Sequence, residues 1–123
     1  MSFLRKSGLW LALILGMMIG PATADSEFLT GDEIQANIIG GTITGLTAQG
    51  DIWSETYHAD GVFSGRGVDG GVLAGRWEID GDFLCVIYEG DPVASCWALM
   101  LEGDDVRYVS EHGSDGGHGT LTR

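Results

Sequence analysis

Short runs of β-branched and aromatic residues alternate with turn signals along most of the chain. Residues 52–57 and 106–110 are two such runs, and their residue types favour extended strands. The turn signals are glycine–aspartate pairs, which recur about every 10 residues and suit tight turns. These pairs are Gly50-Asp51, Asp60-Gly61, Asp69-Gly70, Asp80-Gly81, Gly90-Asp91 and Gly103-Asp104. The pattern predicts a mainly β domain, a single antiparallel meander of about 7–8 strands that forms a small barrel or a sandwich.

One short helix is expected before the first strand. Thr30 and Glu33 have the spacing of a capping box, in which each side chain bonds the other residue's backbone amide. Ile34 and Ile38 then share one face of the helix. A helix over about residues 31–39 is too short to be stable alone, so it must pack against the sheet.

The two cysteines predict a disulfide-linked hairpin. Cys85 and Cys96 lie at equal distances from the Gly90-Asp91 pair, so folding the chain there places the two sulfurs opposite each other. Such a disulfide indicates an oxidising compartment and a small fold that is stabilised by a covalent link. A redox-active pair usually has two residues between its cysteines, whereas these are much farther apart.

The turn signals also predict the register of the central strands. A two-residue turn at Asp80-Gly81 places Trp77 opposite Leu84. Successive residues then alternate between the two faces of the sheet. The face that carries the tryptophans is the expected core, and its members are Trp77, Ile79, Leu84, Val86, Trp97 and Leu99.

Pro92 sets the expected length of the loop between the cysteines. A two-residue loop would need a backbone amide at this position, and proline has none. We therefore predict a four-residue loop over 89–92 that closes on Tyr88 and Val93. The alternation of hydrogen-bonded and open pairs then puts the two cysteines at an open pair, with α-carbons about 4.5 Å apart.

The opposite face of these strands is a candidate binding patch. Arg76, Phe83 and Ile87 share this face with the predicted disulfide. One alternative is that the N-terminal helix covers the two apolar residues through its isoleucines, which is favoured because the helix needs a surface to dock on. The other is that they form an exposed patch that binds a partner.

Residues 1–24 are typical of a secretory signal peptide. Arg5 and Lys6 precede an apolar run that is shorter than the roughly 20 residues needed to span a bilayer, and small residues follow it. We expect cleavage after Ala24. The product is a single β-rich domain over 25–123, periplasmic or secreted, without a stable membrane anchor.

The formal net charge of −12 at pH 7 narrows the range of partners. Arg5 and Lys6 are the only charged residues of the signal segment, so its removal changes the charge to −14. Such a chain repels phosphate backbones, which excludes nucleic-acid binding. Many acidic residues are explained as turn residues, and no cofactor is expected. The expected partner is a protein or a small apolar ligand.

Few residues form a pattern that carries chemistry. His112 and His118 flank the glycine-rich segment 113–117, and together with Asp115 inside it they are the candidates for a zinc or copper site. The competing interpretation is a flexible glycine loop with solvated histidines. His58 is the candidate for a general base, but no nucleophile motif accompanies it, so no catalytic residue is assigned. A small metal-dependent or hydrolytic envelope enzyme is the alternative function.

The order of motifs resembles a recurrent type of small bacterial secreted protein. The motifs are the helix start at 29–34, the stretch from Trp53 to Gly61, the Gly-x-Trp strand at 75–77 and the disulfide-linked hairpin. Over most of residues 29–110 the chain is similar to domains of unknown function with a lipocalin-like antiparallel meander. The resemblance carries no active site across. We therefore expect a noncatalytic binding or protein-interaction module.

Overall fold

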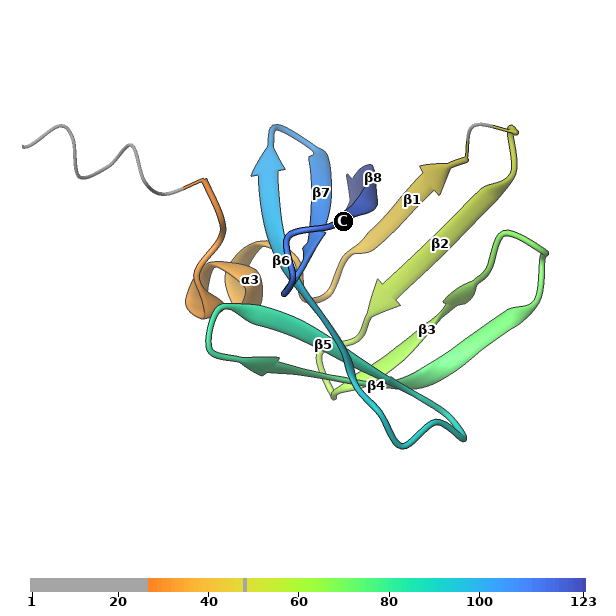
Figure 1. The fold of residues 1–123 in the computed structure, drawn as a ribbon, viewed down its shortest axis with the longest axis horizontal. Coiled ribbons are helices and arrows are strands. Elements are labelled where there is room, and N and C mark those ends of the chain that lie inside the picture. Colours follow the sequence, from red (N-terminus) through yellow and green to blue (C-terminus); the bar gives the residue numbers. More distant parts are fainter. Residues whose placement is uncertain (1–26, 48) are drawn as a thin grey trace, which may run out of the picture.

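The computed structural model describes residues 27–47 and 49–123, so the predicted signal segment lies outside the described residues. One helix and eight strands follow one another in this part of the chain (Figure 1). They are α3 (Gly31–Asn37), β1 (Thr42–Leu46), β2 (Ile52–Tyr57), β3 (Val62–Arg66), β4 (Val72–Asp80), β5 (Phe83–Tyr88), β6 (Ser95–Glu102), β7 (Asp105–Ser110) and β8 (Asp115–Thr122). No helix within the described ranges has the length and apolar character that a bilayer crossing requires.

The strands form a closed barrel. Each strand pairs antiparallel with the next one, and β1 also pairs with β8. At this closing seam Thr42 lies opposite Thr122 and Ile43 lies opposite Leu121. The mainly β meander is confirmed, and the barrel is the correct form of the two that were predicted. Closure pairs the backbone groups of β1 and β8, which would be unpaired edges in an open sheet.

The capping box predicted at the start of α3 is confirmed. Thr30 Oγ1 accepts a hydrogen bond from the Glu33 amide at 3.2 Å, and Glu33 Oε1 accepts one from the Thr30 amide at 2.9 Å. The helix ends at Asn37, earlier than the expected residue 39. Asp82 Oδ1 accepts a hydrogen bond from the Gly31 amide at 2.9 Å, which joins the start of α3 to the β4–β5 turn.

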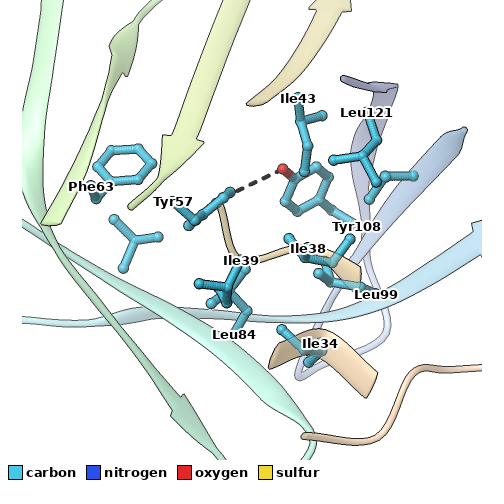
Figure 2. Close-up of a cluster of buried hydrophobic side chains, with 12 residues drawn as sticks. Ile34, Ile38, Ile39, Ile43, Tyr57, Phe63, Leu84, Leu99, Tyr108 and Leu121 are labelled. Atoms are coloured by element: carbon cyan, nitrogen blue, oxygen red, sulfur yellow. Dashed lines mark hydrogen bonds between the residues drawn. The ribbon is translucent and has the colours of Figure 1, made fainter. Parts of the chain in front are cut away.

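The helix closes one end of the barrel. Ile34, Ile38 and the following Ile39 are buried among inward-facing residues of the strands (Figure 2). The rest of this core cluster is Ile43, Tyr57, Phe63, Leu84, Val86, Leu99, Val106, Tyr108 and Leu121. The alternative in which these isoleucines cover Phe83 and Ile87 on the outer face is therefore wrong. A barrel end offers the isoleucines complete burial, which a flat outer wall does not.

The β4–β5 turn differs from the predicted turn by one residue. The strand runs to Asp80, so the turn is Gly81-Asp82, and Trp77 lies opposite Val86 rather than its predicted partner. Gly81 has a φ of 63°, which suits the type II′ turn, where glycine takes the first central position. The register changes by two positions, so every residue keeps its predicted face.

The predicted core face is confirmed by the burial of its residues. Leu84, Val86 and Leu99 are buried inside the barrel. The other three members are half-buried and pack against the core cluster; they are Trp77, Ile79 and Trp97.

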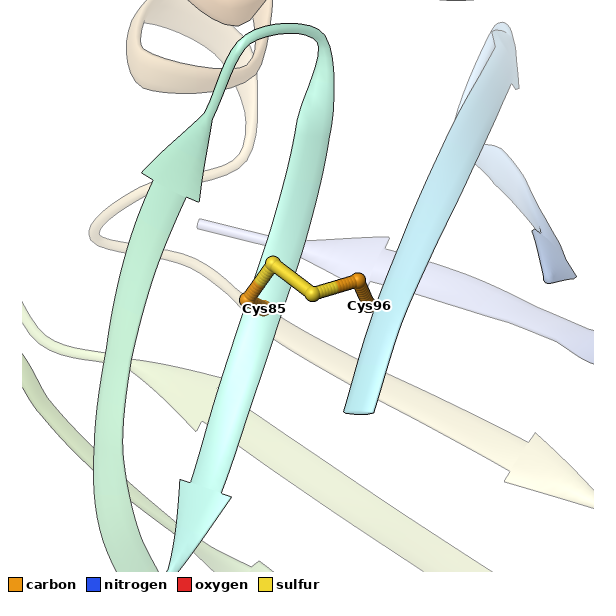
Figure 3. Close-up of a disulfide and its surroundings, with 2 residues drawn as sticks. All are labelled: Cys85 and Cys96. Carbon is orange, nitrogen blue, oxygen red and sulfur yellow. A yellow bond between two sulfur atoms is a disulfide. The ribbon is translucent and has the colours of Figure 1, made fainter. Parts of the chain in front are cut away.

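The predicted disulfide and its register are also confirmed. Cys85 lies opposite Cys96 with 4.0 Å between their α-carbons, and the sulfurs are bonded (Figure 3). A short α-carbon separation is typical of an open pair in an antiparallel ladder. The disulfide is consistent with a periplasmic or extracellular protein.

The loop between β5 and β6 is longer than predicted. The β5–β6 ladder ends at Ser95, so residues 89–94 connect the strands, and no loop closes on Tyr88 and Val93. Within the loop the Asp91 amide donates to the Tyr88 carbonyl at 2.9 Å, and Asp91 Oδ1 accepts from the Val93 amide at 3.0 Å, so these groups of the predicted closing pair are bonded elsewhere. On its other edge the end of β5 pairs with β4, where Tyr88 lies opposite Gly75. Glycine permits this approach, because a β-carbon at this position would collide with the backbone of β5.

Candidate ligand-binding site

The end of the barrel opposite α3 contains a pocket of about 250 Å³, which we call the mouth pocket. The β1–β2, β3–β4, β5–β6 and β7–β8 connections surround this end. Six strands and one connection supply the lining, which consists of Trp53, Glu55, Gly67, Val68, Leu73, Tyr88, Trp97, Tyr108 and Gly116. The barrel is therefore filled by core side chains at one end and hollow at the other.

Aromatic rings form much of the wall. Tyr108 lies edge-on to both Trp53 and Trp97, with 6.1 Å between the ring centroids in each pair. Edge-to-face pairs at this distance are favourable. Gly45 and Gly116 make room for the two indole rings, because a β-carbon at either position would collide with the adjacent tryptophan. Small residues beside large ones thus place the tryptophans inside the barrel.

A carboxylate lies among these rings. Glu55 is on the inner face of β2, between Trp53 and Tyr57. Tyr57 Oη donates a hydrogen bond to Glu55 Oε1 at 2.6 Å, and Tyr108 Oη donates one to the same oxygen at 3.0 Å. Figure 2 shows the two tyrosines pointing toward each other, with 3.4 Å between their hydroxyl oxygens. The two phenols therefore fix the orientation of the carboxylate.

The surroundings raise the pKa of all three tyrosines of the chain. Burial raises the pKa of Tyr57 and Tyr108 well above the usual value, and the neighbouring charge of Glu55 raises both further. The pKa of Tyr88 is raised by its partial burial and by Glu55. The phenols therefore stay protonated and keep donating hydrogen bonds at pH values where free tyrosine ionises.

We expect the protein to lose stability as the pH rises above about 10. There the tyrosines ionise in the unfolded chain but keep their protons in the folded one. The unfolded state then binds fewer protons, so the free energy of unfolding falls by up to about 1.4 kcal/mol per pH unit for each buried tyrosine. Below pH 10 this contribution is fully present.

Urea unfolding between about pH 9 and pH 12 measures this slope. Tyr57→Phe should reduce the slope by about 1.4 kcal/mol per pH unit, because one of the buried phenols is removed. Lysine does not interfere, since Lys6 is the only lysine and lies in the predicted signal segment. An unchanged slope in Tyr57→Phe would contradict the assignment of this pH dependence to the buried tyrosines.

The structure divides the candidate binding patch. Arg76 lies opposite Ile87 on the outer face of β4 and β5, and both residues line a groove together with Val62. Phe83 lies at the other end of β5, opposite Asp80 and outside this groove. The groove shares only Tyr88 with the mouth pocket, and a binding role for the three residues stays a prediction.

The candidate metal ligands do not converge. His118 Nδ1 lies 3.4 Å from Asp105 Oδ1, whereas His112 is exposed in the β7–β8 connection. The expected glycine loop is largely strand, because β8 begins at Asp115. In the described part of the chain, no group of three or more histidine, cysteine, aspartate or glutamate side chains is arranged to hold a metal ion.

His58 has a serine beside it that the sequence did not indicate. Its Nε2 atom lies 2.8 Å from Ser64 Oγ, within hydrogen-bond distance, at the outer surface of the barrel. A catalytic pair of this kind also needs a group that orients the histidine. No carboxylate of the described residues forms an ion pair with His58. Within the described ranges, His58 thus has no carboxylate partner that would complete a triad with Ser64.

No match to the chain was found among protein-family models, curated proteins or solved structures. The resemblance to secreted domains with a lipocalin-like meander stays a prediction. A fold alone does not assign a function, which depends on the chemistry of a site. The mouth pocket is the concave, mostly apolar site inside the barrel.

Sequence reasoning missed the mouth pocket, although one signal pointed to it. Trp53, Glu55 and Tyr57 alternate along one predicted strand, so the glutamate shares a face with two aromatic residues. A carboxylate on an apolar, inward face is unusual enough to indicate a site. No comparable signal in the sequence indicated that Tyr88 and Trp97, which belong to other strands, line the same pocket.

Proposed function

We propose that this chain is a noncatalytic binding protein that holds a small molecule in the mouth pocket. The observation that supports the proposal is the hollow end of the barrel, where aromatic walls enclose a single fixed carboxylate. Small-molecule sites are commonly such concave, mostly apolar pockets with a few placed polar groups.

The protein is proposed to act in the periplasm or outside the cell. The predicted signal segment would direct the chain across the membrane. The bond between Cys85 and Cys96 suits an oxidising compartment. A binding protein in this setting meets small solutes directly.

The mouth pocket limits the size of the ligand. A volume of about 250 Å³ equals roughly eight water molecules at about 30 Å³ each. Pockets that bind drug-sized ligands usually have volumes of about 300–1,000 Å³. The pocket therefore suits a small solute, or a group of that size at the end of a larger ligand.

The lining favours binding over catalysis. Of the described residues around the mouth pocket, none is a histidine, serine, cysteine or lysine, so the groups there that can transfer a proton are Glu55 and the tyrosines. Glu55 is engaged by Tyr57 and Tyr108, which orient it without adding a reactive partner. A binding role needs no more than this arrangement provides.

A larger side chain in the mouth pocket should abolish binding. Leu73 lines the pocket, whereas the adjacent Val72 is exposed on the outer face of β4. We expect Leu73→Phe to weaken binding of a small branched probe, 3,3-dimethyl-1-butanol, by tenfold or more, and Val72→Phe to leave its binding unchanged. Quenching of tryptophan fluorescence reports binding, because Trp53 and Trp97 form the wall. Equal affinities in the two variants would place the site elsewhere.

A further inference from the structure

We propose that the mouth pocket selects small organic cations that carry a methylated ammonium group. The inference rests on the proposed binding function and adds the chemical class of the ligand. It is carried by the arrangement of the aromatic rings, by the position of Glu55 and by the charge of the surrounding connections.

Four aromatic side chains surround the mouth pocket from four different strands. Trp53 belongs to β2, Tyr88 to β5, Trp97 to β6 and Tyr108 to β7. The ring plane of Tyr108 meets those of Trp53 and Trp97 at 69° and 88°. Steeply inclined rings on several sides make a box, and the negative faces of such rings attract a cation. Aromatic cages bind quaternary ammonium groups in this way.

Glu55 adds a negative charge to this box. Its Oε1 atom accepts hydrogen bonds from Tyr57 and Tyr108, which orient the carboxylate but bring no opposite charge. Of the described residues, no arginine, lysine or histidine lines the pocket or forms an ion pair with Glu55. A half-buried charge without an opposite partner is unfavourable. A bound cation provides that partner.

The connections around the mouth pocket are mainly acidic. Their acidic residues are Asp51, Asp69, Glu89, Asp91 and Glu111, and their sequences contain neither lysine nor arginine. One cation lies beside them, because Arg66 at the end of β3 donates a hydrogen bond to the Gly70 carbonyl at 3.0 Å, so the excess of negative charge remains large. A field of this sign raises the local concentration of cations and lowers that of anions. Long-range attraction and the carboxylate inside the pocket therefore favour the same ligand.

A neutral apolar ligand fits the walls but not the carboxylate. It would displace water from Glu55 without supplying a charge in return. An anion would add repulsion from the same group. Because the pocket holds only about 250 Å³, the favoured cation is one of about the size of choline.

Three probes of matched shape and different charge test the inference on the unmodified mature protein. They are choline, its neutral carbon analogue in which carbon replaces the nitrogen, and tert-butylacetate, the corresponding anion. Calorimetric titration at low ionic strength should show choline binding at least tenfold more tightly than the carbon analogue, and tert-butylacetate binding most weakly. If the carbon analogue binds as tightly as choline, the cation preference is wrong and the binding function stands. If no probe binds, both proposals are wrong.

A pair of charge-removing variants locates the preference. Glu55→Gln removes the charge inside the pocket, whereas Glu78→Gln removes one from the exposed outer face of β4. We expect Glu55→Gln to weaken choline binding by tenfold or more and not to weaken binding of the carbon analogue, which no longer has to displace water from a charged group. Glu78→Gln should leave both affinities unchanged. Equal losses in the two variants would show that only net charge matters and would overturn the role of Glu55.

Discussion

Replacing Ile34 with alanine is expected to lower the free energy of unfolding by about 2–5 kcal/mol. The side chain is fully buried inside the end of the barrel, so its removal leaves a cavity among well-packed neighbours. The helix adds to the effect. With seven residues, α3 cannot remain folded unless it is docked, and Ile34 is its buried residue.

Gln35 provides the matched control, because it is exposed on the same helix. We expect Gln35→Ala to change the free energy of unfolding by less than about 0.5 kcal/mol. Urea unfolding followed by circular dichroism measures both variants. Similar stabilities for Ile34→Ala and Gln35→Ala would mean that the helix does not close the barrel.

Removing the disulfide is expected to cost about 2–5 kcal/mol of stability. The bond closes a ring of about 12 residues, which restricts the unfolded chain and contributes roughly 3 kcal/mol in the chain-entropy model. The position of the disulfide in the barrel is a second reason to expect a large effect on stability. The described β5–β6 ladder has three residue pairs, the fewest of any neighbouring strands in the barrel, and the Cys85–Cys96 pair is the middle one.

Two forms of the protein distinguish the contribution of the covalent bond to stability from that of side-chain packing. The double variant Cys85→Ala/Cys96→Ala loses both the bond and the sulfur atoms, whereas reduced wild-type protein loses only the bond. We expect both forms to unfold at lower urea concentration than the oxidised protein, with the double variant the less stable because Cys85 is buried. Equal stability of oxidised and reduced wild-type protein would refute a stabilising role for the bond.

The features that the sequence predicted correctly are local. The capping box of Thr30 and Glu33 depends on residues three positions apart. The pairing of Cys85 with Cys96 depends on a single hairpin, and the alternation of faces holds for any strand. These relations require only backbone geometry and nearby neighbours.

Both errors in the loops involve hydrogen bonds of aspartates that the turn patterns did not include. The β4–β5 turn lies at Gly81-Asp82 rather than at Asp80-Gly81, and Asp82 Oδ1 accepts a hydrogen bond from the Gly31 amide at the start of α3. The β5–β6 loop is longer because the Asp91 amide donates to the Tyr88 carbonyl and Asp91 Oδ1 accepts from the Val93 amide, which occupies groups of the predicted closing pair. The Asp82 contact depends on the tertiary structure, whereas the Asp91 contacts are local and the proline argument did not include them.

Interactions between residues close along the chain are enough to specify the alternation of strands with turns, the cap of the helix, the disulfide register and the face that is buried. The pairing of β1 with β8, the entry of α3 into one barrel end and the position of a carboxylate among aromatic rings at the other depend on the closed barrel as a whole. The mouth pocket gathers residues from six strands. Their convergence depends on how the closed sheet curves in space, which no local pattern specifies.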